Sequence, residues 1–261
     1  DGNGSTDSVI ISRSMITQWS GTIRSLWNPI FIADMNADEE YTGDKRLSRF
    51  EVVGYDLKQL YKIAYSENIE YFPVEGRKNN YGKFWNFPIL EVKDSSQFFV
   101  KTNSSKNFYN YSVMVPRSKN SIAIMQSFLQ RDLEANFGYK GFVEERMMPC
   151  WNLVANTNAG KKLMAKGSKF SGKPSVRTDI MVLDQPVSKL IAELAQSFQR
   201  GYPIIDATGI ETNIDIYIEG LRDDFNDMRR GLQKNGLDLV KSEKKMKVVV
   251  IRDPKPAPSS K

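Results

Sequence analysis

The chain has 261 residues, of which 40% are hydrophobic, and this is enough to bury a core in one large domain or two small ones. The single cysteine, Cys150, excludes an internal disulfide and a CxxC redox motif, and the absence of histidine excludes Ser-His-Asp and Cys-His catalysis and histidine-based zinc sites. The net charge is +6, and the six basic residues of 161–177, where no acidic residue lies, account for it.

The basic segment 161–177 is rich in Gly, Ser and Lys, which favours a solvated connecting loop; a loop that contacts phosphate or lipid is the alternative. Nucleic-acid-binding proteins usually spread their basic residues over a face, so we expect no nucleic-acid partner. No apolar run approaches the roughly 18 residues of a membrane span, so we expect no such span. The chain starts at Asp1 with a linker-like stretch, DGNGSTDS, and we expect a processed protein or a fragment of a longer one.

Apolar alternation, helical spacing and capping residues predict the elements of the first half. Asp56 is placed to cap a helix whose apolar residues recur at i, i+3, i+4 and i+7 from Leu57. A second helix is expected to begin after Asn120 or Ser121 and to end at Gly138. In chain order we predict a strand in 7–19, a short strand at the start of 28–46, a strand over 47–55, helices over 56–66 and 120–138 with a strand over 110–116 between them, and a hairpin of 140–146 and 149–156.

The second half has similar signals. Pro186 lies near the first turn of a predicted helix that Gly201 ends. A buried run, 202–205, meets a tight turn at 206–209. The remaining predictions are a strand over 178–184, the helix over 185–201, a strand over 213–219, a helix over 221–236, a hairpin of 237–245 and 246–253, and a disordered tail.

The two halves also match each other. Residues 50–66 align with 180–196 without a gap, 110–115 falls on 213–218, and 133–156 falls on 232–253. We therefore predict an α+β fold of two tandem duplicated units, each ordered strand–helix–strand–helix–strand–strand, with the helices packed on a small mixed or antiparallel sheet. The predicted segments are an N-terminal junction (1–46), a first unit (47–160) with an aromatic insertion (67–108), a basic linker (161–177), a second unit (178–252) and the tail (253–261).

Three segments, 56–66, 128–156 and 202–216, resemble motifs of an uncharacterised bacterial cell-envelope domain family; "DATGI" at 206–210 is the most specific piece. The second half is also similar to the short N-terminal domain of secretins and TonB-dependent receptors. In some members of the envelope family the domain follows a thioredoxin-like redox domain, and the opening of this chain resembles that junction. The resemblance implies an exported Gram-negative protein, periplasmic or associated with the outer membrane, and no catalytic residues. The insertion is longer and more aromatic here than in the family.

The aromatic insertion is the candidate binding surface. Residues 61–111 hold 13 of the 29 aromatic residues, and "GRKNNYGKFWNFP" mixes rings with Arg and Asn, a mixture that binds sugars or peptides. The alternative is that the rings form a satellite core beneath a long loop. The candidate ligand-binding residues are Tyr71, Arg77, Tyr81, Trp85 and Phe87.

The acidic cluster around the predicted helix 221–236 is the one place where paired carboxylates could act. Asp223 and Asp224 suit the helix N-terminus, and Asp223 and Asp227 share a face. A structural role is the prediction there, and catalysis by paired carboxylates is the alternative. No spacing suggests a metal site or a phosphate-binding loop, so we predict no cofactor, and Cys150 is predicted to be a small buried hydrophobe. The cluster comprises Asp215, Glu219, Asp223, Asp224 and Asp227.

We thus expect a non-catalytic binding or assembly module of the bacterial cell envelope, with an envelope protein as partner. A carbohydrate- or peptidoglycan-binding domain that uses the aromatic insertion is one alternative. A substrate-recognition domain for an attached thioredoxin-like reductase is the other.

Overall fold

The chain is an α+β protein whose helices pack on mixed sheets, and it divides into two compact units. Unit 1 consists of residues 1–71, 87–144 and 247–261, and unit 2 of residues 72–86 and 145–246. In the part of the chain that is described, no helix is long and apolar enough to cross a membrane. The computed structural model describes residues 12–21, 30–32, 47–66, 84–85, 87–100, 105–116, 119, 121–167, 178–198 and 201–254.

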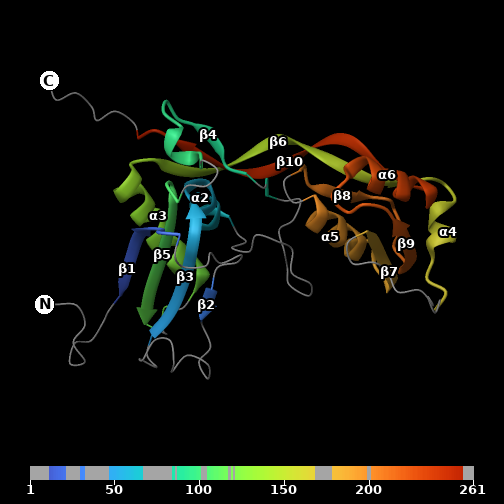
Figure 1. Ribbon diagram of the computed structural model, residues 1–261, viewed down its shortest axis with the longest axis horizontal. Helices are drawn as coiled ribbons and strands as arrows, with labels where there is room; N and C mark the ends of the chain where they lie inside the picture. Colours follow the sequence, from blue (N-terminus) through green and yellow to red (C-terminus); the bar gives the residue numbers. More distant parts are fainter. Residues whose placement is uncertain are drawn as a thin grey trace, which may run out of the picture. The chain divides into compact units, whose positions relative to one another are not determined.

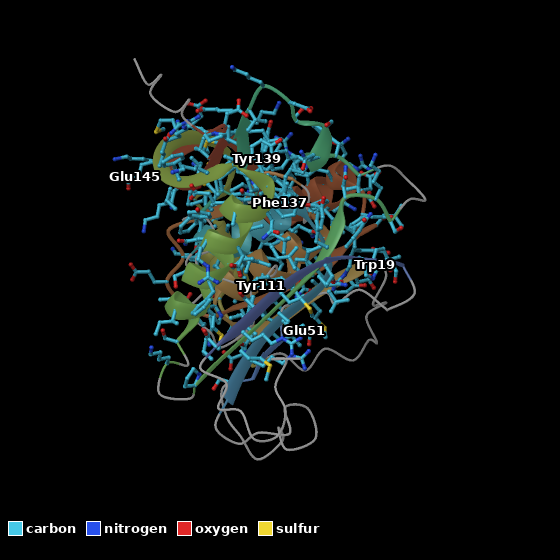
Figure 2. The ribbon with its side chains drawn as sticks, turned by 90° about the vertical axis from the view of Figure 1, so that its left-hand side faces the viewer. Trp19, Glu51, Tyr111, Phe137, Tyr139 and Glu145 are labelled. Carbon is cyan, nitrogen blue, oxygen red and sulfur yellow. The ribbon has the colours of Figure 1, made fainter. Side chains whose placement is uncertain are left out.

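Unit 1 is built on an antiparallel sheet of strand order β1-β5-β3-β2, against which two helices pack (Figure 1). Figure 2 shows α3 lying across this sheet, with Tyr111 of β5 and Phe137 of α3 labelled. The Tyr111 hydroxyl donates to Asp132 Oδ2 of the helix over 3.1 Å. The elements are β1 (Arg13–Gln18), β2 (Ile30–Ile32), β3 (Leu47–Asp56), α2 (Leu57–Tyr65), β4 (Ile89–Glu91), the 3-10 turn η1 (Ser96–Phe98), β5 (Phe108–Pro116) and α3 (Ile122–Phe137).

Both helices of unit 1 begin, and α3 ends, where the capping residues predict. Asp56 and Gln59 form a capping box at the start of α2, each side chain bonded to the backbone of the other residue. Ser121 caps α3, and Gly138 ends it in the left-handed conformation, at φ 78°. Tyr61, fully buried, donates its hydroxyl proton to the Tyr139 carbonyl over 2.7 Å.

Unit 2 repeats this plan on a smaller sheet, in which β7 pairs with β9 in antiparallel fashion while α5 and α6 pack against the strands (Figure 1). Pro186 precedes α5 as predicted, but the helix ends near Phe198 rather than at Gly201. The first two residues of the predicted turn at 206–209 belong to a strand. Asp206, in this strand, accepts from the backbone N–H and from the hydroxyl of Thr208. The elements are α4 (Ala159–Leu163), β7 (Asp179–Gln185), α5 (Val187–Ser197), β8 (Ile204–Ala207), β9 (Ile214–Glu219) and α6 (Phe225–Lys234).

Both units carry the same irregularity at the same place. The β3–β5 register shifts between Val52 and Tyr55, and the β7–β9 register shifts between Val182 and Gln185. In each shift one residue has a positive φ: 71° at Gly54 and 49° at Asp184.

A side chain of the neighbouring strand holds each of these residues. The backbone N–H of Gly54 donates to Asn110 Oδ1 over 3.0 Å, and that of Asp184 donates to Asp215 Oδ1 over 2.9 Å. The two units thus share a bulge of the same form, and the duplication itself stays a prediction from the sequence.

The pairing corrects one block of the predicted overlay. Val52 lies opposite Tyr111 and Val182 lies opposite Ile216, so Tyr111 corresponds to Ile216 and not to Ile214. The overlay was wrong by two residues in this block. Because strands alternate with a period of two, a slip of two residues leaves the apolar pattern unchanged.

Two long strands replace the two predicted hairpins. Each segment is one continuous strand of 16 residues: β6 (Lys140–Ala155) and β10 (Leu237–Arg252). They are neighbours in a sheet of order β4-β10-β6-β8, whose outer strands pair in parallel with the ends of β10 and β6. The predicted hairpins were wrong because neither segment contains a Gly, Asn or Asp turn at its centre that would reverse the chain.

The structure therefore divides the chain differently from the predicted segments. The boundary between the units falls inside β6, after Glu144, and inside β10, after Met246. Ile251, near the end of β10, belongs to the buried core of unit 1, whereas Leu237 and Leu239 at its start belong to that of unit 2. The predicted basic linker begins within α4, and Ala165 donates to the Asn213 carbonyl, so its first part is folded; residues 168–177 lie outside the described residues.

A candidate aromatic binding site

Unit 2 contains a hollow of about 450 Å³, and half of the residues that line it are aromatic. Its walls come from β6, from the end of α5, from the connection to β8 and from the start of α6, so separate parts of the chain build it. We call it the aromatic hollow. It is lined by Trp151, Gln196, Ser197, Phe198, Gly201, Tyr202, Ile204 and Phe225.

The rings of the aromatic hollow contact one another. Phe225 lies 4.8 Å from Trp151 between ring centroids, tilted by 36°, and 5.3 Å from Phe198, edge to face. Tyr202 is 43% exposed, and its ring lies 5.8 Å from that of Trp85. These are favourable distances for aromatic pairs, so the rings hold each other in place while leaving ring surface open.

Local backbone structure positions each ring. The backbone N–H of Trp151 donates to the Pro203 carbonyl over 2.9 Å, next to the parallel pairing of β6 with β8. Phe198 follows the last turn of α5, and the Gly201 N–H donates to its carbonyl over 2.8 Å. Phe225 is the first residue of α6, whose N-terminus Asp224 caps. Three of the rings therefore sit on regular elements or directly beside them, and Tyr202 lies two residues before β8.

Three polar groups of the lining have no partner within the described part of the chain. They are the indole N–H of Trp151, the amide of Gln196 and the hydroxyl of Tyr202. The Lys241 ammonium lies 5.8 Å from the Trp151 ring centroid, and no carboxylate lines the hollow. An open aromatic surface with unpaired donors and acceptors is typical of a binding site for a small polar ligand.

A second hollow, of about 460 Å³, lies in unit 1 beside the exposed ring of Phe99. Asn107, in its wall, already donates its amide protons to the carbonyls of Ser96 and Phe99. The Lys58 ammonium lies 5.0 Å from the Phe99 ring centroid. This hollow has one aromatic ring and offers less surface for stacking.

The structure places two of the five predicted binding residues. Trp85 belongs to unit 2, where it contacts Tyr202, while Phe87 belongs to unit 1 and is 36% exposed. Tyr71, Arg77 and Tyr81 lie outside the described residues. Elsewhere in the insertion, Phe98 is fully buried in the main core of unit 1 rather than in a separate satellite core.

The aromatic hollow was missed in the sequence because its rings are far apart in the chain and follow no period. One signal could have pointed to it: "YPII" at 202–205 repeats "FPIL" at 87–90, which aligns Tyr202 with the exposed Phe87.

The carboxylates around α6 mainly satisfy backbone groups. Asp215 accepts from the N–H of Asp184 and Lys166, and Asp224 accepts from the N–H of Asp227. Asp227 itself accepts from the Leu221 N–H over 2.7 Å, which, with the Arg230 guanidinium, lowers the pKa of its carboxyl. These contacts support the predicted structural role; Glu219 and Asp223 are exposed.

Cys150 is buried, as predicted, and burial raises the pKa of its thiol. Among the residues that the structure describes, no group of three or more His, Cys, Asp or Glu side chains is arranged to hold a metal ion. Comparison with protein-family models, with curated proteins and with solved structures finds no match to this chain.

Proposed function

We propose that this chain is a non-catalytic binding module of the bacterial cell envelope. The observation that carries the proposal is the aromatic hollow of unit 2, where partly open rings and unpaired polar groups lie together. Sites of this composition bind ligands by stacking and hydrogen bonding. The envelope location rests on the family resemblance of 56–66, 128–156 and 202–216.

The surroundings of the aromatic hollow favour binding over catalysis. The lining has no carboxylate, cysteine or lysine, and the chain has no histidine, so the hydroxyl of Tyr202 is the one side chain of the lining that belongs to a usual class of general base. The nearest acidic residue in sequence, Asp224, is engaged in capping α6. A ligand held there would be recognised and released unchanged.

The test is a pull-down from a Gram-negative envelope extract with three baits. They are the wild-type chain, Tyr202→Ala, and a matched control, Leu221→Ala, which replaces a side chain of unit 2 that is 52% exposed and outside the lining. Proteins and glycans in the eluates are identified together. We expect an envelope component that wild type and Leu221→Ala retain and Tyr202→Ala loses. Equal retention by all three baits would exclude the aromatic hollow as the binding site.

A further inference from the structure

We infer that the aromatic hollow binds a saccharide, with a sugar ring stacked on Tyr202 and its neighbours. The inference rests on the proposed binding function and adds the chemical class of the ligand. It is argued from the ring surfaces, from the unpaired polar groups, and from the size and charge of the hollow.

The open ring surface fits the C–H face of a sugar. Tyr202 is 43% exposed although Trp85 lies against it, and the side chains of Trp151, Phe198 and Phe225 are only partly buried. Aromatic faces carry partial negative charge, and the C–H groups on one face of a pyranose carry partial positive charge. Rings that are braced by other rings present such a face without losing side-chain entropy on binding.

The unpaired polar groups favour a saccharide over an apolar ligand. The Trp151 indole can only donate, whereas the Tyr202 hydroxyl and the Gln196 amide can donate and accept. Sugar hydroxyls also donate and accept, so they can satisfy all three groups. An apolar ligand would cover these groups without replacing their water, at a cost of about 1–3 kcal/mol for each buried group.

The size and charge of the aromatic hollow indicate which kind of saccharide it suits. A volume of about 450 Å³ lies at the smaller end of ligand sites and suits a short saccharide. Lys241 beside Trp151 and the absence of carboxylates from the lining favour a neutral or acidic sugar over a cationic one.

The experiment titrates the chain with four soluble saccharides and follows tryptophan fluorescence and heat. The probes are chitotriose, maltotriose, N-acetylglucosaminyl-N-acetylmuramic acid and a lipopolysaccharide core oligosaccharide. We expect saturable binding of at least one probe. Tyr202→Ala should weaken it at least tenfold, Tyr202→Phe less, because the ring remains, and Leu221→Ala not at all. If the acidic disaccharide binds more tightly than chitotriose and Lys241→Gln removes this preference, the Lys241 ammonium belongs to the site.

Two outcomes would overturn the inference. One is no saturable response to any probe; if the pull-down still depends on Tyr202, the binding function survives and only the ligand class is wrong. The other is saccharide binding that Tyr202→Phe, Trp151→Phe and Tyr202→Ala leave unchanged, which would place the sugar elsewhere. The two phenylalanine variants keep a ring in place, so the test does not depend on the alanine variant remaining folded.

Discussion

Lys62 lies in the last turn of α2, where burial lowers the pKa of its ammonium to about 8. Between pH 8 and the unfolded value of 10.5, the unfolded chain holds a proton that the folded chain has released. Stability therefore rises with pH through this window, and below it the partly buried charge is unfavourable.

Replacing this charge tests the argument. We expect Lys62→Met to raise the free energy of unfolding at pH 7, on the order of 1–3 kcal/mol. The difference in unfolding free energy between the variant and wild type should shrink between pH 8 and pH 10, because Lys62 of the wild type then releases its proton on folding. Urea denaturation followed by circular dichroism at several pH values measures it. A difference that is constant with pH would mean that packing, not charge, is responsible.

At the scale of single residues, the sequence predicts helix caps better than it predicts exposed binding surfaces. Asp56, Ser121 and Gly138 cap their helices as predicted, since caps are local and depend on a few backbone groups. The open face of Tyr202 was not predicted, because it depends on Trp85, Phe225 and other residues that only the fold brings together in unit 2.

At the scale of elements, α6 approaches β9 closely at Gly231. A Cβ placed on this residue would lie 2.5 Å from Ile218 Cγ2 and 3.3 Å from the Glu219 carbonyl oxygen. Both neighbours are constrained, because Ile218 is fully buried and the second contact is with backbone. The helix and the strand therefore need a residue without a side chain here.

We expect Gly231→Ala to destabilise the protein by about 1–2 kcal/mol, although alanine is the better helix former. Gly160→Ala in α4 is the matched control, since its Cβ would meet only Ile210, at 3.9 Å. That change should be neutral or stabilising by up to about 1 kcal/mol. Thermal unfolding of the two variants measures the contrast. An equal rise in stability in both would show that α6 can move away from β9.

Helices were easier to predict than long strands. The apolar spacing of 57–65 predicts α2 and the face that it buries. A strand pattern shows which face is buried but not which strand lies beside it, so β6 and β10 were assigned partners within their own segments. Their true neighbours are determined by pairing between residues that lie far apart in the sequence.

At the scale of the whole molecule, the two units share their longest strands. Ile251 is fully buried in the core of unit 1, although the rest of that core comes from residues 50–139. Leu153, near the end of β6, is likewise fully buried, in the core of unit 2. Each core is therefore completed by the far end of a strand that starts in the other unit.

Ile251→Ala should lower the free energy of unfolding by about 2–5 kcal/mol, because it leaves a cavity in the core of unit 1. Val240→Ala, on the same strand at a side chain that is 45% exposed, should cost less than about 1 kcal/mol. Hydrogen exchange should show faster exchange of the β3 and β5 amides in Ile251→Ala. Unchanged protection of those amides would mean that the core of unit 1 packs stably without the Ile251 side chain at the end of β10.

This sharing also governs how the protein is made. As the chain leaves the ribosome, residues 50–139 appear before Ile251, so their core must wait until β10 has been synthesised. The core of unit 2 likewise includes Leu237 and Leu239, so it is incomplete until these residues have been synthesised. Both cores therefore reach their final packing only after β10 has been synthesised, and until then a nascent chain exposes the apolar surface that β10 covers.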